Sequence, residues 1–142
     1  MPESLESFAE LNAIRMRLEG IESKQEMLVR AQAPQILSAI WALVDKDHLL
    51  GQVFLAANGN RTQQEIVDYL RSSGVSASQP TVSRKLDRLM SEMGLIELGV
   101  RKPSGATYRK SSLDRILHLT PKVEKRLGKV DRGVEGRLEE AQ

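Results

Sequence analysis

The sequence predicts a mainly α-helical protein that carries one small β-hairpin. Residues 5–31 contain no proline and repeat apolar residues at alternating steps of three and four, which is the spacing of a helix face. Two further segments, 62–74 and 78–94, each begin with a hydroxyl residue suited to capping a helix and end at a glycine. Two β-prone runs, 95–100 and 107–110, flank a Pro-Ser-Gly triplet that is typical of a hairpin turn.

The composition of the 142-residue chain narrows the function classes. Hydrophobic residues make up 40% and charged residues 28%, as in an ordinary folded domain. The chain has no cysteine, which excludes disulfides, thiolate metal sites and cysteine nucleophiles. His48 and His118 have no metal ligand at a suitable spacing, and no glycine-rich phosphate loop or nucleophile–base pair is visible. We therefore expect neither an enzyme nor a cofactor or metal.

No segment has the pattern of a membrane span or a secretory signal. The longest apolar run, 36–44, is far shorter than the roughly 20 residues that cross a bilayer. The N-terminus carries Glu3, Glu6 and Glu10, whereas a secretory signal begins with basic residues. These patterns lead us to expect a cytoplasmic protein.

The N-terminal helix carries a narrow apolar seam in which Gln25 takes one position. Its apolar members are Leu11, Ile14, Leu18, Ile21 and Leu28. A stripe this narrow is typical of a coiled coil. The repeat is short and Gly20 costs about 1 kcal/mol of helix propensity, so the helix needs a partner. We expect residues 1–33 to form a dimerisation helix; the alternative is a helix folded back on its own domain.

Residues 34–120 are predicted to form one domain. Pro34 starts a helix, a second helix ends at the turn-forming residues 58–60, and Trp41 and Phe54 are expected core aromatics. Thr62 and Glu65 have the spacing of a capping box at the start of the next helix. The helix expected at 79–93 buries a face at helical spacing. That face comprises Val82, Leu86, Leu89 and Met93.

The tail is less strongly patterned. Residues 113–119 form an apolar patch that fits either a helix or a strand. Thr120 and Pro121 are good helix-starting residues, and apolar residues continue at helical spacing through Val130, Val134 and Leu138. We therefore expect a C-terminal helix over 121–142.

Positive charge collects on one segment of the chain. Residues 61–110 carry nine basic and five acidic residues, a net charge of +4, whereas residues 1–33 carry four basic and six acidic residues, a net charge of −2. Such an asymmetry suits a polyanionic partner.

The order helix, turn, helix and basic hairpin is that of a winged helix-turn-helix. In this fold the second helix lies in the major groove of DNA, and the hairpin reaches the backbone or the minor groove. Arginine can pair with guanine, glutamine with adenine and lysine with phosphate. The alternative is a solvated charged face. The predicted DNA-binding residues are Gln79, Thr81, Ser83, Arg84, Lys85, Arg88, Arg101, Lys102, Arg109 and Lys110.

The segments TQQEIVDYLRSSGVSASQPTVSRKLDRL, GLIEL and SGATYRKS resemble the DNA-binding domain of the arginine repressor family. The resemblance implies DNA contacts from Gln79, Thr81, Ser83 and Arg84. Lys85 stands where that family usually has an acidic residue. The residues after Lys110 are too few for the family's arginine-binding domain, so arginine is not implied as an effector. The matching positions are Thr62, Gln63, Glu65, Gly74, Gln79, Thr81, Val82, Ser83, Arg84, Gly105 and Tyr108.

The tail, GLIELG followed by LDRILHLTPKVEKRL, is similar to the multiple-antibiotic-resistance (MarR-like) regulators. This second resemblance implies a longer wing that contains Asp114 and Arg115, although Val123 stands where those regulators have glycine. The wing is therefore expected to end at Lys110 or at Leu119.

Together these patterns predict a homodimeric winged-helix transcription regulator, a repressor that binds double-stranded DNA and associates with the nucleoid. A two-fold dimer implies a palindromic site with half-sites about 34–36 Å apart. The alternatives are a winged-helix adaptor that binds protein, and a plasmid or viral replication, partition or architectural DNA-binding factor.

Overall fold

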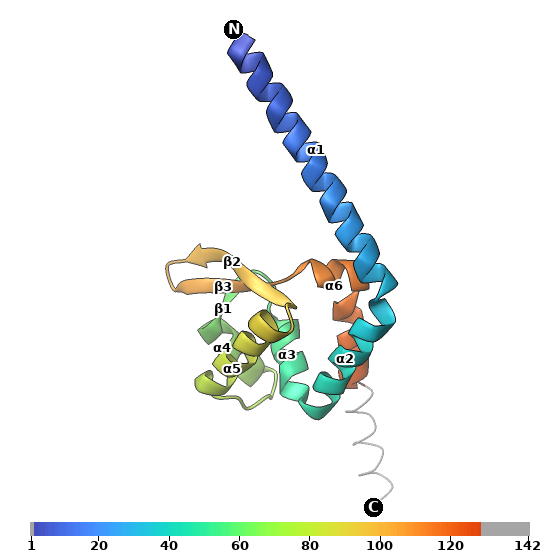
Figure 1. Ribbon diagram of the computed structural model, residues 1–142. Helices are drawn as coiled ribbons and strands as arrows, with labels where there is room; N and C mark the ends of the chain where they lie inside the picture. The colour runs from blue at the N-terminus through green and yellow to red at the C-terminus, as the bar shows by residue number, and fades with distance from the viewer. Residues whose placement is uncertain (1, 129–142) are drawn as a thin grey trace, which may run out of the picture.

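The computed structural model describes residues 2–128, and within the first helix it describes the side chains of residues 9–14, 16, 20 and 22 onward. The predicted mainly helical fold with one hairpin is confirmed (Figure 1). The helices are α1 (Pro2–Ala31), α2 (Ala33–Lys46), α3 (His48–Ala56), α4 (Gln63–Ser72), α5 (Gln79–Asp87), the π-helical turn η1 (Arg88–Glu92) and α6 (Ser112–Leu117).

A three-stranded antiparallel sheet lies beside the helices, in the order β1-β3-β2. Strands β2 (Ile96–Lys102) and β3 (Gly105–Lys110) form the predicted hairpin, which we call the wing. The third strand, β1 (Arg61–Thr62), has only two residues, and it pairs Arg61 with Tyr108 and Thr62 with Thr107. A strand this short has no periodicity, and for this reason the sequence did not reveal it.

The hydrophobic core lies between the helices α2 to α5, the sheet and the tail. Phe54 is 1% exposed, as expected of a core aromatic, and Leu50 and Ile66 are 0% exposed. Trp41 instead packs at the edge of the core and is only partly buried. There the Arg126 guanidinium lies 4.9 Å from the centre of the Trp41 ring and bonds the Asp45 carboxylate.

Two cationic side chains from the sheet bind the carbonyl end of α3. The Lys110 ammonium donates to the carbonyl oxygens of Leu55 at 3.2 Å and Ala57 at 3.0 Å. The Arg61 guanidinium donates to the carbonyl oxygen of Ala56 at 3.0 Å. The last carbonyls of a helix have no partner within the helix, and positive charge is favourable there. These contacts fix the outer strand β1 and the central strand β3 to α3.

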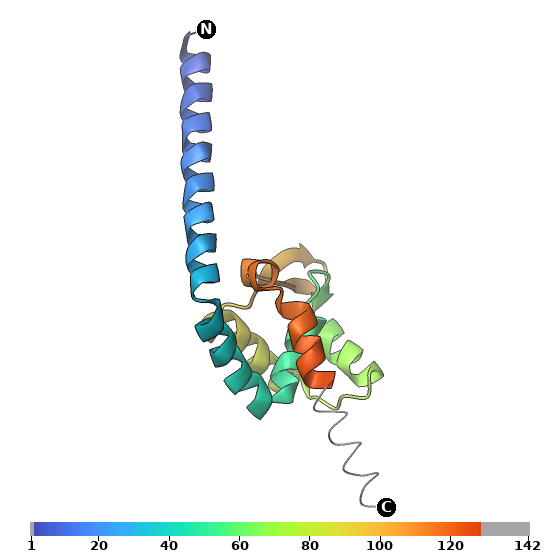
Figure 2. The ribbon, with the colours of Figure 1, turned by 90° about the vertical axis from the view of Figure 1, so that its right-hand side faces the viewer.

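Helix α1 projects away from the rest of the molecule, which we call the head (residues 33–128; Figures 1 and 2). Only its C-terminal end meets the head, where Val29 packs on the core. The C-terminal part of α1, from Glu22, makes an angle of 68° with α2 across Gln32. Among the residues described, no single helix is long and apolar enough to cross a membrane, although this bent pair passes a test of length and composition.

The structure resolves the alternatives for the tail. The patch at 113–119 is helical, since α6 spans Ser112–Leu117, and residues 119–128 continue as a helix. The Asp114 carboxylate accepts bonds from the backbone N–H of Thr120 at 2.8 Å and from its hydroxyl at 2.7 Å. The hairpin ends at Lys110, so the longer wing with Asp114 and Arg115 is wrong: both residues lie on α6. The apolar residues predicted to continue the C-terminal helix beyond Gly128, namely Val130, Val134 and Leu138, lie outside the described residues.

Candidate nucleic-acid interface

Helices α4 and α5 begin with the caps that the sequence predicts. The Thr62 hydroxyl accepts from the backbone N–H of Glu65, and the Glu65 carboxylate accepts from the backbone N–H of Thr62, which completes a capping box. Gly74 takes the left-handed conformation, with φ of 85°, in the turn after α4. The Ser78 hydroxyl accepts from the backbone N–H of Thr81 and caps α5.

The predicted helix at 79–93 is helical from Gln79 to Glu92, but it changes type. It is an α-helix over Gln79–Asp87 and widens into a π-helical turn over Arg88–Glu92. Val82, Leu86 and Leu89 are at most 1% exposed, which confirms these three residues of the predicted inner face. Met93, the fourth, is only partly buried and packs against the core just after the helical turn ends. Of the predicted DNA-binding residues on this helix, only Arg88 lies in the π-helical turn, and the other five lie on α5.

The outer face of α5 presents a short polar surface. Gln79 and Arg84 are exposed, while Thr81 and Ser83 are half-buried. Among the described residues, the only hydrogen-bond partner of the Arg84 guanidinium is the carbonyl oxygen of Pro80, at a long 3.4 Å from Nε. The exposed Asp87 lies one turn further along and was missed in the sequence, because a single acid among bases looks like surface charge.

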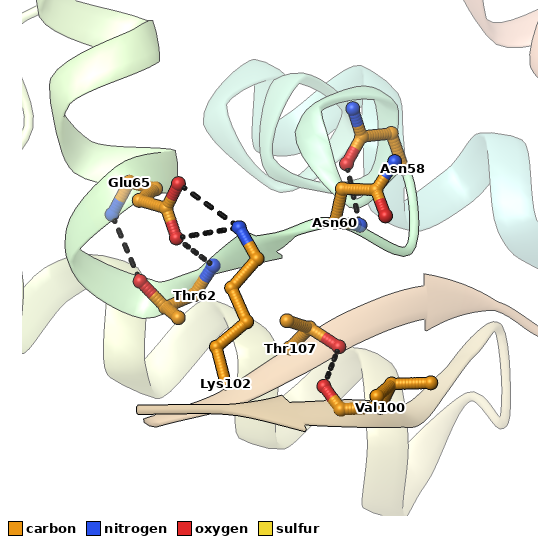
Figure 3. A network of polar contacts seen from close by, with 7 residues as sticks. All are labelled: Asn58, Asn60, Thr62, Glu65, Val100, Lys102 and Thr107. Carbon is orange, nitrogen blue, oxygen red and sulfur yellow. Dashed lines mark hydrogen bonds and ion pairs between the residues drawn. The ribbon is translucent and has the colours of Figure 1, made fainter. Parts of the chain in front are cut away.

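The wing contains a β-bulge at Gly99 and Val100. The strand register shifts between Leu98 and Arg101, and the Thr107 hydroxyl donates to the carbonyl oxygen of Val100 at 2.5 Å (Figure 3). A Cβ atom at Gly99 would lie 2.7 Å from the Thr107 hydroxyl oxygen, so this position accepts only glycine without movement. The bulge leaves Val100 and Arg101 exposed near the tip of the wing.

The wing is anchored to the start of α4 by an ion pair. The Lys102 ammonium lies 3.2 and 3.3 Å from the two carboxylate oxygens of Glu65, the same carboxylate that completes the capping box (Figure 3). The hydrogen bond from the Thr62 backbone, and then the bond from Lys102, hold the pKa of Glu65 below its usual value. Lys102 therefore fixes the wing relative to α4 and α5.

Three other predicted DNA-binding cations have acidic partners within the chain. Lys85 pairs with Asp47, the residue that caps α3, while Arg88 pairs with Glu92 at 3.1 Å. Arg109 pairs with Glu97 across the wing at 2.8 Å. Within residues 2–128 no ion pair is found for Arg84 or Arg101.

Lys110 differs from the other predicted DNA-binding residues because its side chain turns inward to the end of α3. Burial lowers the pKa of its ammonium group, which also lies 5.4 Å from the centre of the Phe54 ring. The sequence could not separate Lys110 from Arg109, because neighbouring residues of a strand differ only in the face on which they lie.

A shallow polar groove separates the starts of α4 and α5 from the tip of the wing. The Gln63 side-chain amide donates to the backbone carbonyl of Gln79 at 3.4 Å across the groove floor. Gln79, the first residue of α5, therefore lies on the same surface as the tip of the wing. The lining residues are Thr62, Gln63, Gln64, Gln79, Ser104, Gly105, Ala106 and Tyr108.

Comparison with known protein families identifies the same segment. Residues 48–105 match the arginine repressor DNA-binding domain, from the start of α3 through the tip of the wing. Neither the curated proteins nor the solved structures include a significant match. The match includes the helix-turn-helix and most of the wing, and it bears out the resemblance drawn from residues 62–110. Residues 48–105 thus resemble the winged-helix DNA-binding domain of that family, and the helices and antiparallel strands observed there fit this fold.

Proposed function

We propose that the protein is a sequence-specific transcription regulator, a homodimeric repressor that reads a palindromic DNA site with α5 and the wing. The observation that carries the proposal is the outer face of α5. It presents Gln79, Thr81, Ser83 and Arg84 together, and Arg84 has no acidic partner among the described residues. A recognition helix in the major groove needs this combination of amide, hydroxyl and guanidinium groups.

Each side chain of this face has a distinct expected role. Arg84 can donate two hydrogen bonds to the O6 and N7 atoms of guanine, and Gln79 can pair with adenine in the same bidentate manner. The Thr81 methyl group can contact the methyl group of thymine. Asp87, which is exposed beyond Arg84, can accept a hydrogen bond from the amino group of cytosine.

The basic residues divide into two groups for contact with phosphate. Arg101 is exposed on the wing and can meet the backbone directly. Lys85, Arg88, Lys102 and Arg109 each have a carboxylate partner within the chain, so a phosphate contact would require an exchange of partners. We therefore expect a weaker salt dependence of DNA affinity than the nine basic residues of the segment 61–110 would suggest.

The dimer is proposed from α1. Leu11, Ile14 and Leu28 are 64%, 52% and 62% exposed in a single chain, which is unusual for large apolar residues aligned on one helix. Leu18 and Ile21 continue the seam in the sequence, but their side chains lie outside the described residues. Pairing two heads through this seam would present two recognition helices to a two-fold symmetric site.

Selection of bound fragments from random duplex DNA, followed by titration of the enriched site, tests the proposal. Arg84→Ala should weaken binding to the enriched site by about 1–3 kcal/mol and relax base choice at one position of each half-site. Arg101→Ala should weaken binding to all duplexes alike. Arg71→Ala is the matched control, because Arg71 is an exposed arginine in the last turn of α4, and it should change neither property. Wild-type affinity of Arg84→Ala for the enriched site would refute this reading face.

One observation favours a protein-binding adaptor as the second candidate. Leu98 and Val100 are 55% and 77% exposed on β2, one of the two edge strands of the sheet. An exposed edge with apolar side chains can pair with a strand of another protein. Absence of duplex binding at low salt in the same titration would favour this function over the first.

A further inference from the structure

The described seam residues of α1 are exposed in a single chain, and Gln25 among them lines the groove between α1 and α6. Leu11, Ile14, Gln25 and Leu28 are all exposed, whereas Val29 on an adjacent face packs against the core. The helix therefore uses one face to hold its own head and leaves the described seam residues uncovered. Figure 2 shows that only the end of α1 lies beside the head. A partner that covers the seam must match the side chains that flank it.

The sequence positions around the seam form a heptad pattern. Leu11, Leu18 and Gln25 take the a positions, and Ile14, Ile21 and Leu28 take the d positions. The flanking g positions are then Glu10, Arg17 and Lys24, and the flanking e positions are Arg15, Glu22 and Val29. We propose that the occupant of the seam is a second copy of this chain, aligned in parallel and in register. This inference rests on the proposed function, since it specifies how the dimer is built.

The charges beside the seam favour the parallel alignment. In a parallel pair, each g residue faces the e residue of the next heptad on the other copy. Glu10 then faces Arg15, and Arg17 faces Glu22, so both pairs have opposite charge. In an antiparallel pair with the same seam, Arg17 lies beside Lys24 of the other copy along one side, which brings like charges together, while Arg15 lies beside Glu22 along the other side. Only the parallel pair therefore has opposite charges along both sides.

The polar seam residue favours the same alignment. In the parallel register Gln25 meets Gln25 of the second copy, and the two amides can hydrogen-bond to each other. In the antiparallel register Gln25 meets Ile14, and each amide is buried against an aliphatic side chain without a partner. A single polar a position of this kind sets the register of a coiled coil.

A groove between α1 and α6 continues the contact surface at the head end of the seam. Val29 and the half-buried Leu113 and Ile116 give it an apolar floor. Glu22 and Glu26 lie on its rim, and Glu26 also approaches Arg115, at 3.5 Å. In the parallel pair, Lys24 of the second copy lies on the same side of the seam as Glu22 and Glu26. The groove therefore adds apolar and charge complementarity to a seam that is short by itself.

The absence of cysteine from the chain allows a direct test by disulfide cross-linking. Gln25→Cys in the full chain, oxidised without DNA, should form a covalent dimer in high yield, because facing a positions lie within the Cα separation of roughly 4.4–6.8 Å that a disulfide requires. Ser23→Cys is the matched control: it lies two residues away, at the f position, and should give only background cross-linking.

Two results would overturn the proposal. If Gln25→Cys and Ile14→Cys each fail to cross-link alone while the double variant Ile14→Cys/Gln25→Cys does so, the pair is antiparallel. If the wild-type chain sediments as a monomer without DNA, the seam has no second copy on it. Cross-linking does not depend on DNA, so a dimer that fails to bind DNA would refute the proposed function and leave this inference standing.

Discussion

Replacing Lys110 by methionine tests the division between DNA-facing and structural cations. The Lys110 ammonium donates two hydrogen bonds to the end of α3, at 3.2 and 3.0 Å. Methionine keeps the length and apolar contacts of the side chain but removes both bonds. At about 1 kcal/mol for each bond, the loss is about 2 kcal/mol. The cost of burying the ammonium, which also lowers the pKa of Lys110, is relieved at the same time and offsets part of that loss.

The expected net effect is a loss of about 1–2 kcal/mol, or a fall in melting temperature of about 3–6 °C for a chain of this size. Thermal unfolding followed by circular dichroism measures it. DNA affinity and its salt dependence should stay near wild type, because the Lys110 side chain turns away from the proposed interface.

Arg101→Met is the matched control on the same hairpin, with an exposed side chain. It should leave the melting temperature unchanged and reduce the slope of log affinity against log salt by about 0.9 for each DNA phosphate that the wing no longer neutralises. If Lys110→Met melted like wild type and reduced the salt slope as Arg101→Met does, our assignment of Lys110 to the fold would be refuted.

Three further predictions concern the capping box and the bulge of the wing. Thr62→Ala removes the hydroxyl that caps α4 and should destabilise the chain by about 1 kcal/mol in urea unfolding, whereas Thr62→Ser should stay near wild type. Gly99→Ala brings a Cβ atom against the Thr107 hydroxyl and should cost about 1–3 kcal/mol; recovery in Gly99→Ala/Thr107→Ala would locate the clash, and an unchanged melting temperature in the single variant would contradict it. The pKa of Glu65 in the folded chain lies below its usual 4.5, so the stabilising contribution of its carboxylate is present above that pH and declines as the pH falls through the lowered pKa. Glu65→Gln should flatten this part of a plot of melting temperature against pH. An unaltered plot would exclude the effect.

Local sequence chemistry was sufficient to predict most of the helices and the hairpin. The capping box at Thr62 and Glu65, the cap at Ser78 and the glycine after α4 are short-range patterns, in which the interacting atoms belong to residues at most a few positions apart. The buried face of α5 followed from helical spacing alone.

Features that depend on long-range contacts were not predictable in this way. Strand β1 exists only because β3 lies beside it, and the inward turn of Lys110 depends on α3, more than 50 residues earlier in the chain. The pairing of Lys102 with Glu65 likewise requires the wing to fold over the start of α4. The sequence identified the basic character of the surface that carries the ten predicted DNA-binding residues. The structure separates the cations that have an ion-pair partner from those for which none is found among the described residues. Their contact with DNA stays a prediction.

The short, bent junction between α1 and the head has a consequence for the relative orientation of two heads in a dimer. Only Gln32 interrupts the helical backbone between Ala31 and Ala33, so the rotational setting of the head about the α1 axis follows from residue number. Inserting one residue between the seam and Ala31 would rotate the head by about 100° relative to the partner-facing side, while inserting seven would return it close to its starting angle. The geometry of any two-headed assembly is therefore sensitive to insertions in α1 with the period of the helix itself.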